Sequence, residues 1–207
     1  MLIAVDGPLA SGKGTIARAL AARFGLPHLD TGTLYRAVAV AVLEAGGNPR
    51  DAGAAEAAAR ALDLSDIDEA AIRTAGAGAA ASIVSAHPGV RAALKALQQD
   101  FARQPGGAVL DGRDIGTVIA PEADVKLYVT ASAEVRASRR WSELVGRGDD
   151  ITLDQVMSQL LERDGRDAAR ADAPLMKADD AIELDTSDMN EAEAIAAAIA
   201  IVETRRA

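Results

Sequence analysis

The sequence predicts a doubly wound α/β fold, and three observations lead to this prediction. Five short apolar runs recur along the 207 residues, and each ends in polar or turn residues. Alanine-rich stretches with helical spacing separate these runs, and a glycine-rich loop joins the first run directly to the first helical stretch. Strands that alternate with helices form a parallel sheet covered on both faces, which explains why the runs are apolar throughout.

The five runs are expected to be buried strands, in the order Leu2 to Val5, Leu26 to Leu29, Ala108 to Leu110, Val125 to Val129 and Ile182 to Leu184. The main helical stretches are Ile16 to Phe24, Leu34 to Leu43, Val90 to Phe101 and Glu191 to Val202. Two helix starts have the pattern of a capping box, in which Thr152 precedes Gln155, and Asp188 precedes Glu191, by three residues.

Two regions interrupt the alternation of strands and helices. Gly46 to Gly78 begins with a Gly-Gly-Asn-Pro turn and continues as acidic, alanine-rich sequence, which predicts a small helical insert. Gly146 to Asp150 is a polar turn between two helical segments and is expected to be mobile. Because no internal repeat or long linker divides the chain, we expect one domain over residues 1–207.

The composition argues against several classes of function. The chain has no cysteine, which removes disulfide frameworks, thiolate nucleophiles and zinc-finger spacings. A formal net charge of -9 disfavours binding to nucleic-acid polymers and to anionic membranes. No uncharged apolar stretch reaches the roughly 18 residues of a membrane span, and the N-terminus lacks the basic segment of a signal peptide. We therefore expect a cytoplasmic monomer that binds small molecules.

The loop after the first strand predicts a phosphate-binding loop, or P-loop. It lies between a strand and a helix and comprises Gly7, Pro8, Leu9, Ala10, Ser11, Gly12, Lys13, Gly14 and Thr15. Glycines allow several backbone N–H groups to approach phosphate oxygens, and the helix N-terminus adds partial positive charge. Lys13 would neutralise the β- and γ-phosphates of a nucleotide during transfer. The alternative is a glycine-rich turn that arose by chance.

The P-loop departs from the usual motif at Gly14, where Ser or Thr is common. The hydroxyl moves to Thr15, which would contact either Mg2+ or the α-phosphate. A P-loop does not by itself distinguish kinases, GTPases and motor ATPases. The chain lacks the Asn-Lys-x-Asp motif that reads guanine, which argues against a GTPase switch.

Two later segments are candidates for holding a second substrate. Arg36 would lie one turn into the helix after the second strand, where a guanidinium suits a phosphate; the alternative is a surface arginine on a capped helix. Asp111 ends the third strand at the edge of the sheet where ligands bind, and would hold magnesium through water. Its alternative is an ordinary Asp-Gly turn. His28 and His87 are expected to be structural.

Arginines are concentrated in one segment. Seven of the chain's eighteen lie within 35 residues: Arg136, Arg139, Arg140, Arg147, Arg163, Arg166 and Arg170. Arg163, Asp167 and Arg170 share one helical face, and Arg136 and Arg140 share another. These are either solvated helix faces with Arg–Asp pairs or a site that neutralises two phosphate-bearing substrates. The P-loop favours the second interpretation.

Together these segments resemble the bacterial cytidylate kinases, a family of the nucleoside monophosphate kinase group, over nearly the whole chain. The resemblance rests on Gly7-Pro8 with Gly12-Lys13-Gly14-Thr15, Leu29-Asp30-Thr31-Gly32 with Tyr35-Arg36, Ser82 with Pro88-Gly89-Val90-Arg91, Asp111-Gly112-Arg113-Asp114, Arg139-Arg140, and Glu162-Arg163-Asp164 with Arg166-Asp167 and Arg170. It implies a five-stranded parallel sheet with a P-loop, an acceptor-binding region over residues 37–100 and a lid over residues 137–160.

The resemblance also implies a reaction, in which the γ-phosphoryl group of ATP passes to CMP or dCMP and gives ADP with CDP or dCDP. ATP would carry Mg2+, held mainly by phosphates and water with Thr15 as a weak ligand. The residues that would be catalytic are Lys13, Arg136, Arg140 and Asp111. Arg147 would join the P-loop in binding ATP.

The resemblance divides the acceptor-binding residues by role. The pyrimidine would be read by Ser82, Arg91 and Asp114, and the sugar would be reached by Arg163 and Asp167. The phosphate partners would be Arg36, Arg113 and Arg170. Asp30 and Thr31 would complete the CMP-binding set.

One segment departs from the family. Gly46 to Gly78 is shorter than the family's insert and lacks its strands, although it also ends in Ile72-Arg73-Thr74. Two other functions stay open: a related kinase for UMP, AMP or a small hydroxyl metabolite, and a non-catalytic ATP-binding switch. An assay over several acceptors would distinguish these functions.

Overall fold

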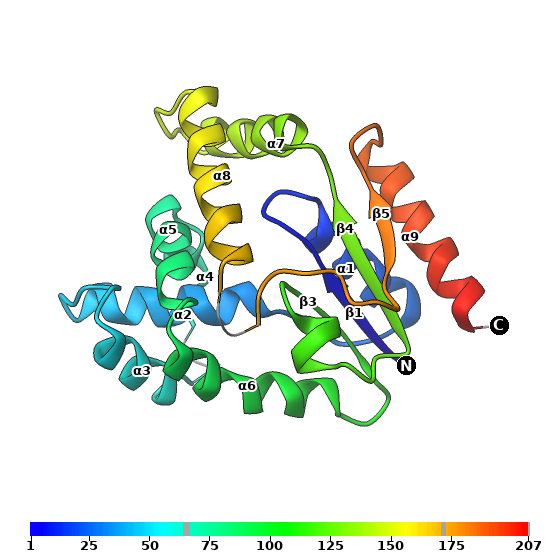
Figure 1. Cartoon of the computed structure of the whole chain (residues 1–207), viewed down its shortest axis with the longest axis horizontal. Helices are drawn as coiled ribbons and strands as arrows, with labels where there is room; N and C mark the ends of the chain where they lie inside the picture. The colour runs from blue at the N-terminus through cyan, green and yellow to red at the C-terminus, as the bar shows by residue number, and fades with distance from the viewer. Residues whose placement is uncertain (64–66, 171–172, 207) are drawn as a thin grey trace. The chain divides into compact units, whose positions relative to one another are not determined.

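A computed structural model describes residues 1–63, 67–170 and 173–206, and Figure 1 shows its helices and strands. In chain order these are β1 (Leu2–Asp6), α1 (Lys13–Phe24), β2 (His28–Asp30), α2 (Thr31–Glu44), α3 (Ala52–Arg60), α4 (Glu69–Ile72), α5 (Ala75–Val84), α6 (Pro88–Ala102), β3 (Ala108–Gly112), the π-helical turn η2 (Ile115–Ile119), β4 (Val125–Thr130), α7 (Ala133–Gly146), α8 (Leu153–Ala168), β5 (Ile182–Asp185) and α9 (Glu191–Arg206).

The strands form one sheet in the order β2-β3-β1-β4-β5, within the described residues. β1 pairs in parallel with β3 and with β4, so that Ile3 lies opposite both Val109 and Val125. All five predicted strands are present, which confirms the doubly wound α/β fold. From β1 the sheet continues through β3 to β2 on one side and through β4 to β5 on the other. The carboxyl end of β1 is therefore the switch point of the sheet, where ligands bind in such folds.

Each face of the sheet has its own apolar core. Ile3 and Val5 of β1 face one way and pack with Ile16 and Leu20 of α1 and with buried residues of α9. Ala4 faces the other way and packs with residues of β3, η2 and the end of α6. Successive residues of a strand point to opposite faces, so a strand covered on both faces must be apolar throughout.

The helix starts confirm one predicted capping box and correct the other. Before α8, the Gln155 N–H donates to Thr152 Oγ1 at 3.2 Å, and the Thr152 N–H donates to Gln155 Oε1 at 2.9 Å. The box predicted at Asp188 and Glu191 is wrong. Asn190 exchanges the equivalent bonds with Glu193, at 3.0 and 2.9 Å. Because α9 begins at Glu191, its N-cap is Asn190, and the pattern applies two residues further along.

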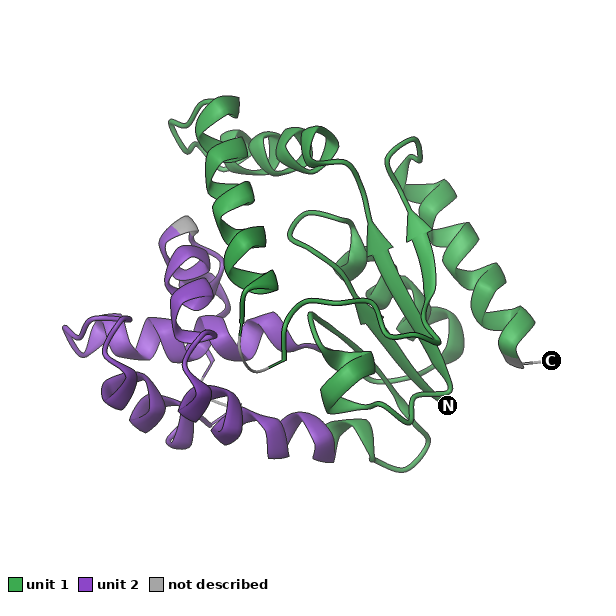
Figure 2. Ribbon diagram, in the orientation of Figure 1, with its two compact units in different colours: residues 1–29, 101–207 green, residues 30–100 purple. Residues whose placement is uncertain are grey.

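The chain divides into two compact units, coloured separately in Figure 2. Unit 1 comprises residues 1–29 and 101–207, and unit 2 comprises residues 30–100. Unit 2 is helical, and its central helix α2 packs against α3, α4 and α5. The insert predicted from Gly46 to Gly78 is helical in its described part, whereas residues 64–66 lie outside the described residues. No helix in the described part of the chain is long and apolar enough to cross a membrane.

In unit 1, the polar turn predicted from Gly146 to Asp150 connects α7 to α8, which pack against each other. The side chain of Trp141 spans this turn, since its Nε1–H donates to the carbonyl oxygen of Ile151 at 3.0 Å. Trp141 is the only tryptophan in the sequence.

Candidate functional site

The P-loop connects β1 to α1 and depends on backbone geometry that side chains would obstruct. A Cβ at Gly7 would lie 2.0 Å from the carbonyl oxygen of Val129, so only glycine allows β4 to approach so closely. Ala10 and Gly12 adopt left-handed backbone at φ 60 and φ 90. A non-glycine residue in this conformation is uncommon and is often found at functional sites.

The N-terminus of α1 opens onto this loop. The N-cap of α1 is Gly12, so no capping side chain at this position covers the N–H groups of the first turn. Such a helix end binds anions. Lys13 is the first residue of α1, and its Nζ donates to the carbonyl oxygen of Pro8 at 3.3 Å, across the loop. The loop therefore combines backbone donors with one full positive charge.

Asp111 lies beside the same helix end, where the sequence predicted a magnesium partner. A Cβ at Gly14 would be 3.7 Å from Asp111 Oδ2, so glycine here leaves the carboxylate close to α1. The other carboxylate oxygen is 2.7 Å from Nε2 of His28, a residue predicted to be only structural. Sequence reasoning missed this contact because His28 and Asp111 are 83 residues apart.

The side chains beside the P-loop offer oxygen atoms that fit the edge of a magnesium site. The described residues contain no group of three or more His, Cys, Asp or Glu side chains that could bind a metal ion. Thr15 supplies a hydroxyl at the start of α1, to which Arg18 donates at 3.3 Å, and Asp111 supplies a carboxylate. Oxygen ligands of this kind suit Mg2+, which keeps much of its water.

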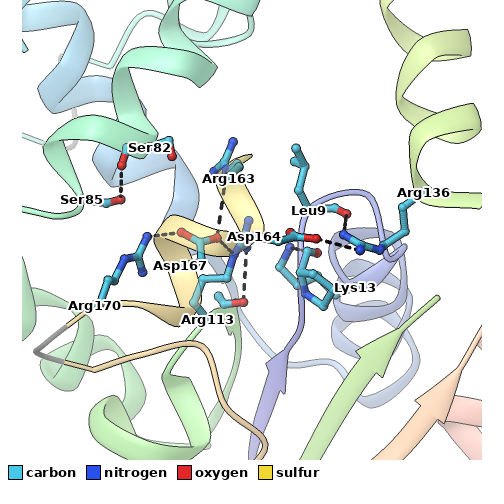
Figure 3. Close-up of polar contacts among 12 residues, drawn as sticks. Leu9, Lys13, Ser82, Ser85, Arg113, Arg136, Arg163, Asp164, Asp167 and Arg170 are labelled. Atoms are coloured by element: carbon cyan, nitrogen blue, oxygen red, sulfur yellow. Dashed lines mark hydrogen bonds and ion pairs between the residues drawn. The ribbon is translucent and has the colours of Figure 1, made fainter. Parts of the chain in front are cut away.

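Arg136 is buried against the P-loop. Its Nη1 donates to the carbonyl oxygen of Leu9 at 3.3 Å, and its Nε donates to that of Ala131 at 3.0 Å. Its Nη2 donates to Asp164 of α8 at 2.7 Å (Figure 3). The remaining N–H groups of this guanidinium are left for other acceptors. Arg140 and Arg147 instead both pair with Glu143 on α7.

Asp167 of α8 gathers three of the predicted acceptor-binding arginines. Its side chain is 0% exposed, and Arg113 Nε donates to its Oδ2 at 2.9 Å. Arg170 contacts its other oxygen, and Arg163 Nε lies 4.0 Å away (Figure 3). Burial raises the pKa of Asp167, but Arg113, Arg170 and Arg163 outweigh burial and hold that pKa below its ordinary value. One anion therefore holds three cations together, and such a concentration of guanidinium groups suits a phosphate.

Asp6, at the end of β1, is a buried carboxylate that the sequence analysis did not single out. Its two oxygens accept from the N–H groups of Ile115 and Gly116, at 2.8 and 2.7 Å. The pKa of Asp6 is raised to about 7, and burial is the largest cause. The two N–H donors act to lower this pKa, whereas the nearby charge of Asp114 acts to raise it. Asp6 thus ties the strand before the P-loop to the turn that follows Asp114, which is also buried.

Unit 2 contains the other predicted acceptor residues. Arg36 of α2 donates to the carbonyl oxygen of Ile72 at 3.0 Å, and a Cβ at Gly78 of α5 would lie 3.6 Å from its guanidinium. Ser82 is buried one turn further along α5, on the same face as Gly78. Arg91 of α6 is also buried, and its Nη1 donates to the hydroxyl of Tyr35 at 3.5 Å.

The start of α2 accounts for the last two predicted residues. Asp30 caps this helix, because its Oδ1 accepts from the N–H of Gly32 at 2.9 Å. Thr31, the first residue of α2, is buried. The alternative interpretation of this segment was a capped helix with a surface arginine. The cap is present, but Arg36 lies partly buried against α5.

The sheet order and the glycine loop at the carboxyl end of β1 define a P-loop fold. The arginines that gather around Asp164 and Asp167 in unit 1 suit a phosphotransferase of that fold. Comparison with known proteins then identifies the family: a family model described as Cytidylate kinase matches residues 3–204, and the chain belongs to this family.

The curated relatives agree over the full length of the chain. A cytidylate kinase of Xanthobacter autotrophicus is 62% identical over 207 residues, which cover 100% of this chain and 99% of that protein. A cytidylate kinase of Caulobacter sp. is 58% identical and covers 100% and 95%. A solved structure of an uncharacterized protein from Eubacterium ventriosum has a TM-score of 0.54 at 13% identity, with coverage of 100% and 98%. That last likeness supports the fold alone.

Proposed function

We propose that this chain transfers the γ-phosphoryl group of ATP to CMP or dCMP, giving ADP and CDP or dCDP. The observation that carries this proposal is the family match over residues 3–204, in a chain whose P-loop is complete. The two relatives described above are named cytidylate kinases and are matched over 99% and 95% of their length. The proposal therefore concerns the activity of the whole protein and not of one part. We further propose that the protein acts as a monomer in the cytoplasm.

On the donor side, the backbone N–H groups of the P-loop hold the phosphates of ATP, and Lys13 neutralises charge as the γ-phosphoryl group leaves. Magnesium bound to ATP would screen the β- and γ-phosphates, with Thr15 and Asp111 on its water shell. Arg136 lies against the loop and has donors to spare for the transferred group. Arg140 and Arg147 belong to a lid over residues 137–160, and would exchange Glu143 for phosphate when ATP binds.

On the acceptor side, separate groups of residues bind the phosphate, the pyrimidine and the sugar. The acceptor phosphate is bound by the guanidinium groups of Arg36, Arg113 and Arg170. The pyrimidine is read by Ser82, Arg91 and Asp114, and the sugar is bound by Arg163 and Asp167. The acceptor-binding region covers residues 37–100, and Asp30 and Thr31 complete it. Cytosine presents an NH2 donor where uracil has a carbonyl, so a buried carboxylate such as Asp114 favours cytosine.

The proposed reaction is tested by measuring ADP formation with CMP, dCMP, UMP and AMP in turn. We expect the highest kcat/KM with CMP or dCMP. Release of phosphate at the same rate without an acceptor would indicate an ATP-binding switch, and a preference for UMP or AMP would indicate a related kinase.

Two variants test how the acceptor is recognised. Asp114→Ala should lower kcat/KM for CMP by roughly tenfold to a hundredfold and change that for UMP far less, because the base contact is lost. Arg36→Ala should weaken both acceptors alike, since a phosphate carries no base identity. An equal loss for CMP and UMP in Asp114→Ala would assign Asp114 a positioning role instead.

A further inference from the structure

The loop that follows β5 contacts the P-loop through one buried hydroxyl. Thr186 continues the pairing of β4 with β5, since its N–H donates to the carbonyl oxygen of Thr130 at 2.9 Å. The residue is 1% exposed. Its hydroxyl oxygen lies 3.1 Å from the carbonyl oxygen of Ser11 in the P-loop and 3.1 Å from that of Thr130.

Arg139 of α7 limits the directions in which this hydroxyl can donate. Its Nη1 donates to Thr186 Oγ1 at 2.9 Å, and its Nη2 donates to the carbonyl oxygens of Thr186 and Met189 at 2.7 and 3.3 Å. A guanidinium can only donate, so the hydroxyl accepts from Arg139 and must send its own proton to a carbonyl. Both carbonyls within reach lie at the carboxyl end of the sheet, and one of them belongs to the P-loop.

The carbonyl of Ser11 is part of the peptide that ends at Gly12, the N-cap of α1. The peptide bonds of the described residues are all trans. In a planar trans peptide the C=O and N–H groups point in opposite directions, so a hydrogen bond that holds Ser11 O also fixes the direction of the Gly12 N–H. Gly12 has left-handed backbone at φ 90, which leaves this peptide dependent on outside contacts for its orientation.

We infer that Thr186, oriented by Arg139, is a positioning residue that fixes the Ser11–Gly12 peptide and thereby aims a backbone donor at the phosphates of ATP. This inference rests on the proposed function only in taking ATP as the ligand of the P-loop. It extends the donor site to the loop after β5, in which the sequence analysis predicted a helix cap but no site residue. Neither Thr186 nor Arg139 has to touch a phosphate for this role.

The test compares the affinity for ATP with the KM for CMP in variants of the full chain. Thr186→Val keeps the shape of the side chain and removes the hydroxyl, whereas Thr186→Ser keeps the hydroxyl. Thr204→Val is the matched control, because the Thr204 hydroxyl donates to the carbonyl oxygen of Ala200 at 2.8 Å on the exposed side of α9. Calorimetric titration with ATP alone gives a Kd that does not depend on any acceptor.

We expect Thr186→Val to weaken ATP binding by about fivefold to tenfold, the effect of one hydrogen bond, and to leave the KM for CMP within about twofold. Thr186→Ser should recover most of the affinity, and Thr204→Val should match the wild type. An unchanged Kd for ATP in Thr186→Val would overturn the inference. So would an equal loss for ATP and CMP accompanied by a lower Tm, since that pattern indicates a purely structural role.

Arg139→Lys serves as a second variant if Thr186→Val does not fold. Lysine keeps the charge but cannot bridge the three oxygens with a planar fork, so the Kd for ATP should rise in the same direction. An unchanged Kd in folded Arg139→Lys would equally overturn the inference. A wild-type chain that binds ATP but phosphorylates neither CMP nor dCMP would instead refute the proposed function, and the Kd values would still decide the role of Thr186.

Discussion

Two buried aspartates in unit 1 show two different ways of holding a carboxylate. Asp6, beside the P-loop, accepts from two backbone N–H groups, and burial raises its pKa to about 7. Asp167, on α8, is surrounded by three arginines, which hold its pKa below the ordinary value against the effect of burial. The difference shows that the carboxylate at the end of β1 is held by backbone donors, whereas the carboxylate on α8 is held by charged side chains.

This contrast predicts opposite behaviour with pH. In the folded chain Asp6 keeps its proton up to about pH 7, whereas in the unfolded chain it loses the proton near the ordinary aspartate pKa of 3.8. Between these values the folded state binds more protons, so the stability that Asp6 contributes falls as the pH rises from about 4 to about 7, and is constant above. A shift of about three pKa units corresponds to about 4 kcal/mol in total.

Asp6→Asn cannot ionise and should lack this dependence. We expect the free energy of unfolding in urea, compared between wild type and Asp6→Asn, to show the advantage of the wild type shrinking from pH 5 to pH 8. A difference that stays constant over this range would mean that Asp6 titrates with an ordinary pKa. Asp6 and Asp167 would then differ only in their hydrogen-bond partners.

The second prediction concerns the Asp167 cluster. Asp167→Asn keeps the shape of the side chain but leaves three arginines without their shared counterion, which should lower the free energy of unfolding by about 3 kcal/mol. The pKa of Asp167 is lower in the folded chain than in the unfolded chain. The stability that Asp167 contributes is therefore lost only on acidification, as the pH falls below the ordinary aspartate pKa and through the folded pKa. The loss should therefore be the same at pH 5 and pH 8, unlike that at Asp6.

Glu162→Gln is the matched control for this variant. Glu162 lies on the same helix and pairs with Arg166, but its side chain is 69% exposed. An exposed pair of this kind contributes less than about 1 kcal/mol. If both variants lost the same stability in urea unfolding, the Asp167 cluster would not differ from a surface ion pair.

The third prediction concerns the one full charge within the P-loop. Lys13→Ala should fold normally, because the loop keeps its contacts with Arg136 and Thr186, but kcat should fall by on the order of a hundredfold or more. Lys177→Ala is a suitable control, since Lys177 pairs with Glu183 on the exposed surface. Near-normal kcat in folded Lys13→Ala would contradict the assignment of the phosphate loop.

Local patterns were sufficient to predict the sheet and the P-loop. Continuous apolar runs identify buried parallel strands, and a glycine-lysine loop between a strand and a helix is a local signal. The spacing of Arg163, Asp167 and Arg170 correctly predicted that these side chains come together, but only Arg163 and Asp167 lie on α8, because the helix ends at Ala168 and Arg170 follows it. The roles of individual residues in binding CMP and ATP stay predictions.

Other features depend on contacts between distant parts of the chain and were missed for that reason. Asp6 bonds to Ile115 across 109 residues, and Thr186 bonds to Ser11 across 175. Arg113 reaches Asp167 from the end of β3, 54 residues away. The cap of α9 was misplaced because Asp188 and Asn190 both fit the same local pattern, and the sequence alone does not show which residue begins the helix.

The position of Trp141 has a practical consequence for testing the proposed lid. It is the sole tryptophan of the chain, and its indole N–H bonds to Ile151 at the far side of the turn between α7 and α8. Fluorescence excited selectively in tryptophan therefore comes from this one side chain. The native protein thus carries its own optical reporter, and stopped-flow mixing with nucleotides can follow this turn without any attached dye.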